Sequence, residues 1–349
     1  MVETLSLKGR DYIAEMEYTR HEMETILELA FSQKKLYASG TPHEVLKGKT
    51  FFMLFYNKSL RTRNSFEAGM FHLGGNAHYL TPDAVYMPAK QGDEVAFTTE
   101  RICDVAQVLA RMGHGIGIRI YGDLVGWVYG KGNEYIREFA KWAQVPVINM
   151  EDDLFHPCQE IADLMTMKEF LGPDLKGKKL VMSWAYSPSV KKPMAVAHSN
   201  VIGGTMFGMN VVVAHPKGFE LDPMVVAKGK ELADLYGGSL EFTNNMEEAF
   251  EGADVVYPKS WPVIENLPPY SKTPMHDKTK KLADKNKHWM CDAKKMKLIK
   301  KTGIYMHCLP CDRGFEVTDE VADGPQSVIF HEAENRLHGQ KALMTLLMR

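Results

Sequence analysis

The chain has few cysteines and no arrangement of them that predicts a disulfide framework. Its 349 residues include five, namely Cys103, Cys158, Cys291, Cys308 and Cys311. An odd, scattered set is typical of reduced thiols in a reducing compartment. Cys308 and Cys311 form one C-x-x-C, but a zinc site normally needs a second pair at a suitable spacing. We therefore expect neither a metal site nor redox chemistry.

Long apolar segments and an excess of one charge are also lacking. No apolar run approaches the ~20 residues needed to cross a bilayer, and the N-terminal region, with Lys8, Arg10 and Asp11, has no secretory hydrophobic segment. The 42 basic and 44 acidic residues give a formal net charge of -2, without a basic block typical of nucleic-acid binding. The expected protein is cytoplasmic and binds neither membrane nor nucleic acid.

Strand-like and helix-like segments alternate along the whole chain, which is typical of parallel sheets covered by helices. A chain of 349 residues with 45% hydrophobic content usually forms more than one core. The predicted fold class is α/β, with two doubly wound parallel-sheet domains linked by helices. Strands are predicted at Phe51–Tyr56, Asn76–Leu80, Gly115–Tyr121, Pro146–Met150, Lys179–Tyr186, Asn210–His215, Leu240–Thr243, Asp254–Pro258 and Gly303–Cys308. Helices are predicted at Tyr18–Tyr37, Ser65–Leu73, Thr99–Met112, Asn133–Trp142, His156–Phe170, Met194–Phe207, Pro223–Tyr236, Met246–Glu251 and Glu332–Met348.

One long segment interrupts this alternation. Residues Pro262–Lys287 contain four prolines and many lysines, and such a composition predicts a long mobile loop that could act as a lid.

A short polar string, Ser59-Leu-Arg61-Thr62-Arg63, lies between a predicted strand and a predicted helix. The start of a helix carries unpaired N–H groups and a partial positive charge, which together favour a phosphate group. Arginine adds a planar fork that matches phosphate oxygens. Alone, the string also fits an ordinary helix cap followed by solvated arginines.

Three further motifs decide between these interpretations. They are His156-Pro-Cys-Gln159, His307-Cys-Leu-Pro310 and Glu334-Asn-Arg336, in that order after the Ser-x-Arg-Thr-Arg string. With these motifs the chain resembles the aspartate/ornithine carbamoyltransferase superfamily over nearly its whole length. The resemblance implies a carbamoyl-phosphate-binding domain, residues 1–155, joined by the C-terminal helix 332–349, and an acceptor-binding domain, residues 156–331.

The resemblance also implies the roles of individual residues. Those that bind carbamoyl phosphate would be Ser59, Leu60, Arg61, Thr62, Arg119, His156, Gln159, Cys308, Leu309 and Arg336. Of these, Arg61, Arg119, His156 and Gln159 would act in catalysis, and Cys308 and Leu309 would contribute main-chain carbonyls. No metal or cofactor is implied. Carbamoyl phosphate is a mixed anhydride, so the enzyme needs to position an amine and stabilise charge, without a nucleophile of its own.

The acceptor is less clearly indicated. The segment Asp254-Val-Val-Tyr-Pro-Lys259-Ser-Trp261 resembles the N-acylornithine branch of the superfamily and relatives of unassigned acceptor. The resemblance implies that Lys259 and Glu151 contact the acceptor, which we expect to be ornithine or an N-acylated ornithine. After Cys-Leu-Pro, however, this chain has Cys311-Asp312-Arg313 followed by Glu316, where the branch carries basic residues. We expect this change to place a negative charge beside the acceptor instead of a positive one. A diamine, oxamate or another acceptor therefore remains an alternative.

Two features of the whole molecule follow from the same resemblance. The segment Tyr86–Glu94 would reach a neighbouring subunit's site through Lys90 and Gln91, which implies a homotrimer. The stretch Ser187–Ala197 would form the loop of a knotted second domain. Without the resemblance, the first segment would be interpreted as an exposed loop.

Two other classes of function compete with carbamoyl transfer. Gly203, Gly204 and Gly208 hint at a nucleotide-dependent oxidoreductase, but they lie in a helix-like stretch instead of following a strand. A protein that binds carbamoyl phosphate without turning it over is the other alternative, and Glu316 is the residue that favours it.

Overall fold

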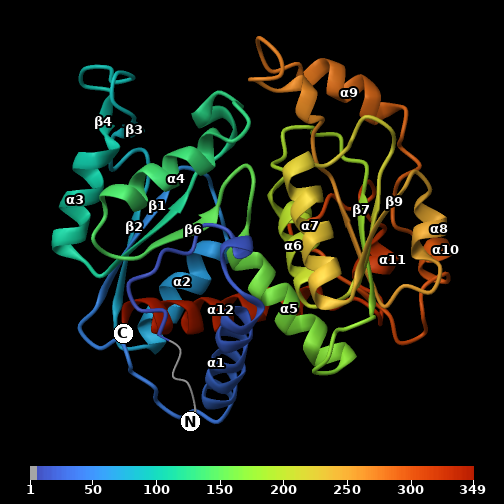
Figure 1. Ribbon diagram of the computed structural model, residues 1–349, viewed down its shortest axis with the longest axis horizontal. Coiled ribbons are helices and arrows are strands. Elements are labelled where there is room, and N and C mark those ends of the chain that lie inside the picture. The colour runs from blue at the N-terminus through green and yellow to red at the C-terminus, as the bar shows by residue number, and fades with distance from the viewer. Residues whose placement is uncertain (1–5) are drawn as a thin grey trace. The chain divides into compact units, whose positions relative to one another are not determined.

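The computed structural model describes residues 6–349, and the chain divides into two compact units. The first unit comprises the residues up to Val125, Gly130–Ile161 and Arg336–Arg349; the second comprises Gly126–Tyr129 and Ala162–Asn335. Apart from the short segment Gly126–Tyr129, the chain passes from one unit to the other within two helices, α5 (Pro157–Leu171) and α12 (Ile329–Met348) (Figure 1). Within residues 6–349, no helix is long and apolar enough to cross a membrane.

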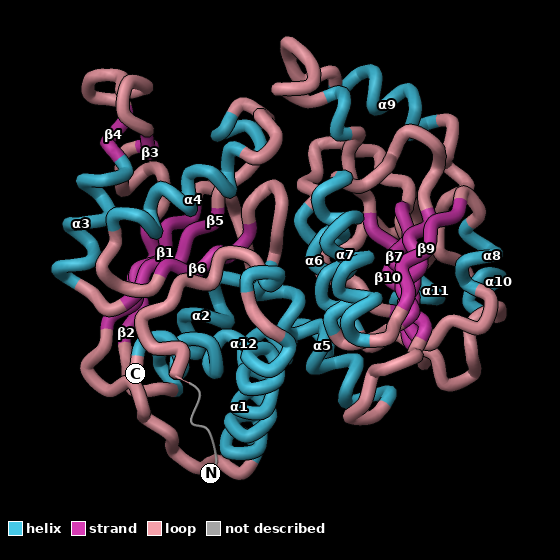
Figure 2. Tube along the Cα trace, in the orientation of Figure 1, coloured by secondary structure: helices cyan, strands magenta, loops and turns pink. Residues whose placement is uncertain are grey.

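The first unit is built on a parallel sheet in the order β2-β1-β5-β6. Its strands are β1 (Thr50–Phe55), β2 (Asn76–Leu80), β5 (Gly115–Arg119) and β6 (Val147–Glu151). Helices α3 (Ile102–Met112) and α4 (Lys131–Trp142) cover one face, and α2 (Arg61–His72) and the end of α12 cover the other (Figure 2). Helix α1 (Arg20–Ala38) begins with a capping box formed by Thr19 and Glu22. Short elements complete this unit: η1 (Glu15–Glu17), β3 (Met87–Ala89), β4 (Thr99–Arg101) and η2 (Gly122–Val125).

Strand β1 is buried on both faces because its residues alternate between two cores. Leu54 packs in a cluster with Ile116, Ile118 and the apolar side of α4. On the opposite face, Phe51 stacks on Phe66 of α2 with ring centroids 5.3 Å apart. Gly117 of β5 makes room for this stack, because a Cβ there would lie 2.8 Å from the Phe51 ring. The phenylalanine-rich strand and the G-I-G-I strand therefore fit each other.

The second unit has a five-stranded parallel sheet in the order β11-β10-β7-β8-β9. Its strands are β7 (Lys179–Trp184), β8 (Asn210–Ala214), β9 (Ser239–Thr243), β10 (Val255–Lys259) and β11 (Ile304–Tyr305). Helices α6 (Ala195–Met206) and α7 (Pro223–Tyr236) lie on one side, and α8 (Met246–Phe250) and α10 (Ala293–Met296) lie on the other (Figure 1). The remaining elements are η3 (Ile264–Asn266), α9 (His276–Asp284) and α11 (Asp319–Ala322).

The strand order reverses once in each sheet, between β1 and β5 in the first unit and between β7 and β10 in the second. In open α/β sheets, ligands bind beyond the carboxyl ends of the strands at such a reversal. Arg119 ends β5, Lys259 ends β10, and the polar string beginning at Ser59 follows β1. Both reversals therefore lie beside residues that the sequence selects as functional.

The predicted fold class is confirmed, but several local predictions are wrong. The helix predicted from Thr99 begins at Ile102, because Thr99–Arg101 forms β4. The helix predicted from Ser65 begins at Arg61, where the Ser59 hydroxyl accepts from the Thr62 N–H and orders the turn before the helix. The strand predicted at Gly303–Cys308 shortens to Ile304–Tyr305, because the His307 N–H donates to the Glu332 carboxyl group. The segment predicted as a mobile loop contains η3 and α9, and α9 buries Thr279 and Ala283.

The glycines that suggested a dinucleotide fold have a packing role. Gly203 and Gly204 lie inside α6, where a Cβ on Gly204 would lie 2.8 Å from both Leu180 and Val211. Gly208 follows the helix with a φ of 71°. None of the three lies between a strand and the start of the next helix, so the phosphate-binding geometry of a dinucleotide site is not formed here.

Candidate functional site

The first group of candidate residues lies at the start of α2. The Ser59 hydroxyl accepts from the Thr62 N–H at 3.2 Å, which orders the turn before the helix. Arg61 is the first residue of the helix, so its guanidinium joins the unpaired N–H groups and positive dipole end of α2. The Leu60 side chain is 72% exposed, and only its main chain faces this turn. The start of α2 therefore offers several hydrogen-bond donors to an anion.

Arg336 of α12 joins this group from the far end of the sequence. Its side chain is only 1% exposed. Nη1 donates to Gln159 Oε1 at 2.6 Å and Nη2 donates to Thr62 Oγ1 at 2.8 Å. Burial, together with the positive charges of Arg119 and Arg61, lowers the pKa of Arg336. Residues of α2, α5 and α12 thus converge within the first unit.

A second triplet in the same unit consists of Arg119, Glu151 and His156. Arg119 forms an ion pair with Glu151 and donates from Nη2 to the Tyr121 hydroxyl at 3.1 Å. His156 Nε2 lies 3.4 Å from Glu151 Oε2. Burial tends to lower the pKa of Arg119, but the charge of Glu151 outweighs this effect, and the pKa is raised. Glu151 is predicted to contact the acceptor, but here it forms an ion pair with Arg119, which is predicted to bind the phosphate.

His156 is neutral in this environment. Its side chain is buried, and burial lowers its pKa well below the ordinary value, with Arg336, Arg119 and Arg61 adding repulsion. A neutral imidazole carries one N–H, which can donate to a carbonyl oxygen without adding a fourth positive charge.

The region contains three arginines, a neutral histidine and one carboxylate. The Nε of Arg119 is buried and makes no hydrogen bond to any residue in the described range 6–349. An unsatisfied buried donor next to clustered cations is unfavourable until an anion accepts from it. The arrangement can therefore hold a doubly charged anion such as a phosphate.

Sequence reasoning missed the residues that fix this geometry. Asn57 accepts from the Tyr121 N–H at 2.9 Å and donates to the Tyr121 carbonyl at 3.1 Å, which joins the exits of β1 and β5. Asp152 accepts from the N–H groups of Leu154 and Phe155, both at 2.7 Å, and fixes the turn that leads to His156. A single asparagine or aspartate after a strand is too common a signal to select in advance.

The second unit holds the remaining candidates in a separate cluster around Glu316. Its carboxylate accepts from the N–H groups of Ser260 and Asp312, both at 2.7 Å, and Oε2 lies 3.2 Å from His307 Nε2. Lys259 Nζ lies 3.5 Å from Oε1. Burial tends to raise the pKa of Glu316, but Lys259 and His307 outweigh it and the pKa is strongly lowered.

The expectation that Glu316 presents a negative charge to the acceptor is therefore wrong. Its side chain is fully buried, and its hydrogen bonds go to the protein. Asp312, the other acidic departure, accepts from the Ser187 hydroxyl at 2.6 Å and from Lys192 Nζ at 2.9 Å. Glu316 consequently gives no support to a protein that has lost turnover.

Cys308 and Leu309 lie in a strained turn that Glu316 supports through His307. Leu309 has a φ of 54°, and its N–H donates to His307 Nδ1 at 2.9 Å. A non-glycine residue at positive φ is held there by its surroundings, and such strain is typical of ligand-binding turns. The turn makes the main-chain carbonyls of Cys308 and Leu309 available, as the resemblance implies.

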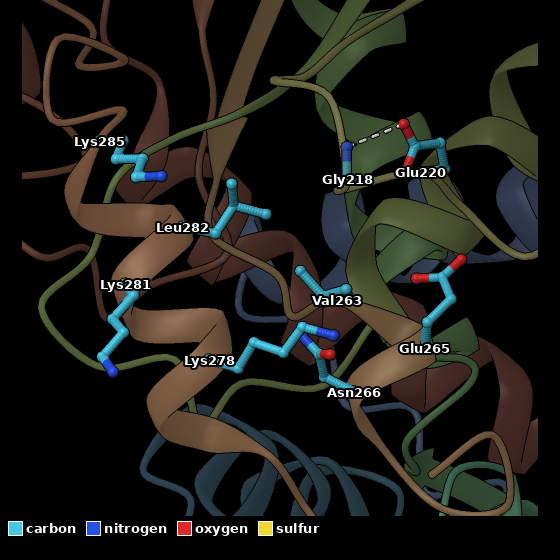
Figure 3. Close-up of a pocket in the computed structure, with 9 residues that line it drawn as sticks. All are labelled: Gly218, Glu220, Val263, Glu265, Asn266, Lys278, Lys281, Leu282 and Lys285. Atoms are coloured by element: carbon cyan, nitrogen blue, oxygen red, sulfur yellow. Dashed lines mark hydrogen bonds between the residues drawn. The ribbon is translucent and has the colours of Figure 1, made fainter.

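A pocket in the second unit involves none of the residues predicted to form the site. It is a cavity of about 430 Å³ between α9, η3 and the loop after β8 (Figure 3). Its lining residues are Gly218, Glu220, Val263, Glu265, Asn266, Lys278, Lys281, Leu282 and Lys285. Seven of these belong to the segment 262–287, which therefore forms the wall of a pocket.

The segment predicted to reach a neighbouring subunit, Tyr86–Glu94, contains β3 and the first part of the loop between β3 and β4 in the first unit. Lys90 forms an ion pair with Glu134 of its own chain, and Gln91 is exposed. Beyond them, Val95 is 56% and Phe97 is 95% exposed.

The fold and the arginine cluster together define an α/β enzyme that binds a phosphorylated substrate. Two family models match the chain: "Aspartate/ornithine carbamoyltransferase, carbamoyl-P binding domain" over residues 10–169, and "Aspartate/ornithine carbamoyltransferase, Asp/Orn binding domain" over residues 191–347. The chain belongs to the aspartate/ornithine carbamoyltransferase family and is a carbamoyltransferase.

Individual relatives cover almost the entire chain. It is 40% identical to an ornithine carbamoyltransferase of Symbiobacterium thermophilum, over 98% of this chain and 99% of the relative. It is 37% identical to an N-acetylornithine carbamoyltransferase of Xanthomonas campestris, over 99% and 98%. Among solved structures, acetylornithine transcarbamylase complexed with acetylcitrulline has a TM-score of 0.88 at 36% identity, covering 97% of this chain and 99% of that one. Ornithine carbamoyltransferase from Pyrococcus furiosus has a TM-score of 0.82 at 38% identity, with 99% of both chains covered.

Proposed function

We propose that the protein transfers the carbamoyl group of carbamoyl phosphate to the side-chain amine of ornithine or an N-acylated ornithine. The products are a citrulline-type amino acid and phosphate. The observation that carries this proposal is the convergence of Arg61, Arg119 and Arg336 on the start of α2, beside a neutral histidine. The first unit binds carbamoyl phosphate, and the second binds the acceptor.

Each group around the start of α2 has a task in this reaction. Ser59, Thr62 and the main chain at Leu60 donate to the phosphate, and Arg61 and Arg336 neutralise its charge as it leaves. Arg119 bridges the phosphate and the carbonyl oxygen, and its buried Nε supplies one of the donors.

The carbamoyl group itself is held by His156, by Gln159 and, as the family resemblance implies, by the main-chain carbonyls of Cys308 and Leu309. His156 donates to the carbonyl oxygen, on which negative charge develops as the amine attacks. Gln159 and the carbonyls of Cys308 and Leu309 accept from the carbamoyl amino group. The phosphate leaving group takes the proton of the attacking amine, so no side-chain base is needed.

The acceptor binds near Lys259 in the second unit. The Lys259 ammonium is 3.5 Å from the buried Glu316 carboxylate, so it is held in place while it attracts the carboxylate of an amino acid. Glu151 raises the pKa of Arg119 through their ion pair. An acceptor ammonium group can approach the same carboxylate. The named relatives divide between ornithine and N-acetylornithine enzymes, so an experiment must decide between the two.

The test is an acceptor panel with purified protein and carbamoyl phosphate. The acceptors are ornithine, N-acetylornithine, N-succinylornithine, putrescine, aspartate and oxamate, with phosphate release and product mass as readouts. We expect turnover with ornithine or one of its N-acyl derivatives. Turnover with putrescine or oxamate alone would assign a different acceptor, and no turnover with any amine would contradict the proposed function.

We further propose that three copies of the chain share their active sites through the loop between β3 and β4. Exposed Val95 and Phe97 on this loop are more readily explained by burial against another copy than by contact with water. Gln91 is exposed and reaches the neighbour, whereas Lys90 is held by Glu134 at the base of the loop.

A further inference from the structure

Two buried carboxyl groups in the second unit have no part in the function proposed above. Asp163 lies on α5 and Glu332 on α12, and both side chains are 0% exposed. Asp163 Oδ2 accepts from Asn200 Nδ2 at 2.9 Å, and the carboxyl groups of Asp163 and Glu332 are hydrogen-bonded to each other. Two carboxyl groups in contact inside a protein share one proton, because they cannot both be ionised.

The surroundings of Glu332 favour its protonated form. Burial, followed by the negative charge of Asp163, raises its pKa well above the ordinary value. The His307 N–H and the Tyr257 hydroxyl also face this carboxyl group, and their hydrogen bonds only partly oppose the shift. The protonated form of Glu332 is therefore favoured, and the hydrogen bond between the two carboxyl groups holds the shared proton.

The Glu332 carboxyl group also contacts the main chain that leads into the strained turn. Oε1 accepts from the Tyr257 hydroxyl at 3.0 Å, and Oε2 accepts from the His307 N–H at 2.9 Å. His307 in turn accepts at Nδ1 from the N–H of Leu309, whose φ is 54°. One carboxyl group thus fixes the residue from which the turn starts.

We propose that Glu332 is a positioning residue for carbamoyl transfer. Through the hydrogen bond from the His307 N–H, its carboxyl group holds the His307 main chain so that the carbonyls of Cys308 and Leu309 accept from the carbamoyl amino group. This inference rests on the proposed function, which assigns those two carbonyls to carbamoyl phosphate. A neutral acid suits this place, because an ionised one would put a second buried negative charge against Asp163.

Two substitutions at Glu332 separate its proton from its hydrogen bonds. Glu332→Gln keeps the volume, a donor toward Asp163 and an acceptor for the His307 N–H, but has no titrating proton. We expect its kcat and its KM for carbamoyl phosphate to stay within about twofold of the wild type. Glu332→Met keeps the volume and removes the hydrogen bonds; losing one such bond to the turn should raise the KM for carbamoyl phosphate about tenfold, with less effect on the KM for the acceptor.

Asp254→Asn is the matched control. Asp254 is a buried carboxylate just before β10, and it accepts from the Lys179 N–H and from Lys300 Nζ, both at 2.8 Å. Neither of these hydrogen bonds involves the His307–Leu309 turn. The control should lower the Tm and leave the KM for carbamoyl phosphate unchanged.

The shared proton has its own readout in the pH dependence of unfolding. A carboxyl group whose pKa is raised by folding contributes stability that is fully present below its unfolded pKa, about 4.3, and is lost as the pH rises through the folded value. For one proton, the unfolding constant of the wild type should increase about tenfold per pH unit across that window. Glu332→Gln should lack this component.

Three results would overturn the inference. In the first, Glu332→Gln raises the KM for carbamoyl phosphate as much as Glu332→Met does. In the second, Glu332→Gln unfolds with the same pH dependence as the wild type. In the third, Glu332→Met leaves the KM for carbamoyl phosphate unchanged. If Glu332→Met does not fold, the two measurements on Glu332→Gln decide. A wild-type protein that turns over no acceptor would instead contradict the proposed function, and the proton count would still report the shared proton.

Discussion

At the scale of residues, the chemistry depends on which charges burial preserves. Arg119 keeps its charge because Glu151 pairs with it, whereas the pKa of His156 is lowered by burial and, to a smaller extent, by the three arginines around it. The region around the start of α2 therefore has positive charge for a phosphate and one neutral donor for a carbonyl oxygen. Both properties arise from the neighbours of each residue and not from its identity alone.

The first prediction concerns Arg61. Arg61→Ala should reduce kcat/KM for carbamoyl phosphate by about 10²- to 10³-fold, because one charged donor at a developing anion is worth that much. Arg63→Ala is the control, since Arg63 pairs with Glu67 at 3.2 Å and lies over the Tyr79 ring at 3.8 Å. Steady-state kinetics and thermal unfolding should show lost activity only for Arg61→Ala, with both proteins folded. Equal activity of the two variants would remove Arg61 from the site.

The second prediction concerns the neutral state of His156. Because its folded pKa lies below the unfolded value of about 6.5, its contribution to stability is present above pH 6.5 and is lost as the pH falls through the folded pKa. His156→Gln should reduce the dependence of unfolding free energy on pH below 6.5 by one proton. The exposed His331→Gln variant controls for the loss of a histidine. A wild-type slope in His156→Gln would show that the imidazole is charged in the folded protein.

At the scale of elements, the sequence predicted periodic segments well and boundaries poorly. Apolar runs are enough to place the strands of the two larger sheets, because many of their side chains are buried, but β3 and β4 were not predicted. The predicted start of α2 is four residues too late because the first turn of the helix is polar and is ordered by the hydrogen bond from the Thr62 N–H to Ser59, not by a hydrophobic period. Helix α9 was missed because most of its residues are polar and only a few, including Ala283, are buried.

The candidate site divides in the same way. Residues in distinctive motifs, such as His156 and Arg336, could be selected from the sequence through the resemblance. Asn57 and Asp152 could not, because their importance comes from main-chain groups that folding brings near them. Glu316 was misinterpreted because the sequence shows its charge but not the four partners that enclose it.

The third prediction tests how Glu316 joins two loops of the second unit. Glu316→Gln leaves the Lys259 ammonium without its buried counter-charge, which should cost about 3–5 kcal/mol of unfolding free energy and raise the KM for the amino-acid acceptor. Because folding lowers the pKa of Glu316, the wild-type contribution is present above pH 4.3 and is lost on acidification. Chemical denaturation at pH 7 and pH 4 measures this, with the exposed Glu320→Gln as control. Identical stability of the two variants would contradict the account.

At the scale of the whole molecule, each unit is an α/β fold with one strand-order reversal, and each reversal lies beside candidate residues. The knot predicted at Ser187–Ala197 stays a prediction, as does the homotrimer. Strand order needs contacts between distant segments, and so neither unit's exact order follows from local patterns in the sequence.

The fourth prediction concerns assembly. The 39.5 kDa chain should behave in solution as a trimer, measured by light scattering coupled to size exclusion. Phe97→Ser and Val95→Ser together should weaken the trimer, because these exposed side chains lie on the loop proposed to contact a neighbour. Leu235→Ser, at an exposed position of α7, is the control. A wild-type monomer with full activity would contradict shared active sites.

The central claim is that a phosphate group binds at the start of α2 among arginines from three parts of the chain. A crystal structure of the protein with carbamoyl phosphate tests it most directly. The account predicts phosphate oxygens within hydrogen-bonding distance of Ser59, Arg61 and Arg119, with Arg336 beside them. A phosphate group bound elsewhere, or one bound at this site without contact to any arginine, would contradict the account.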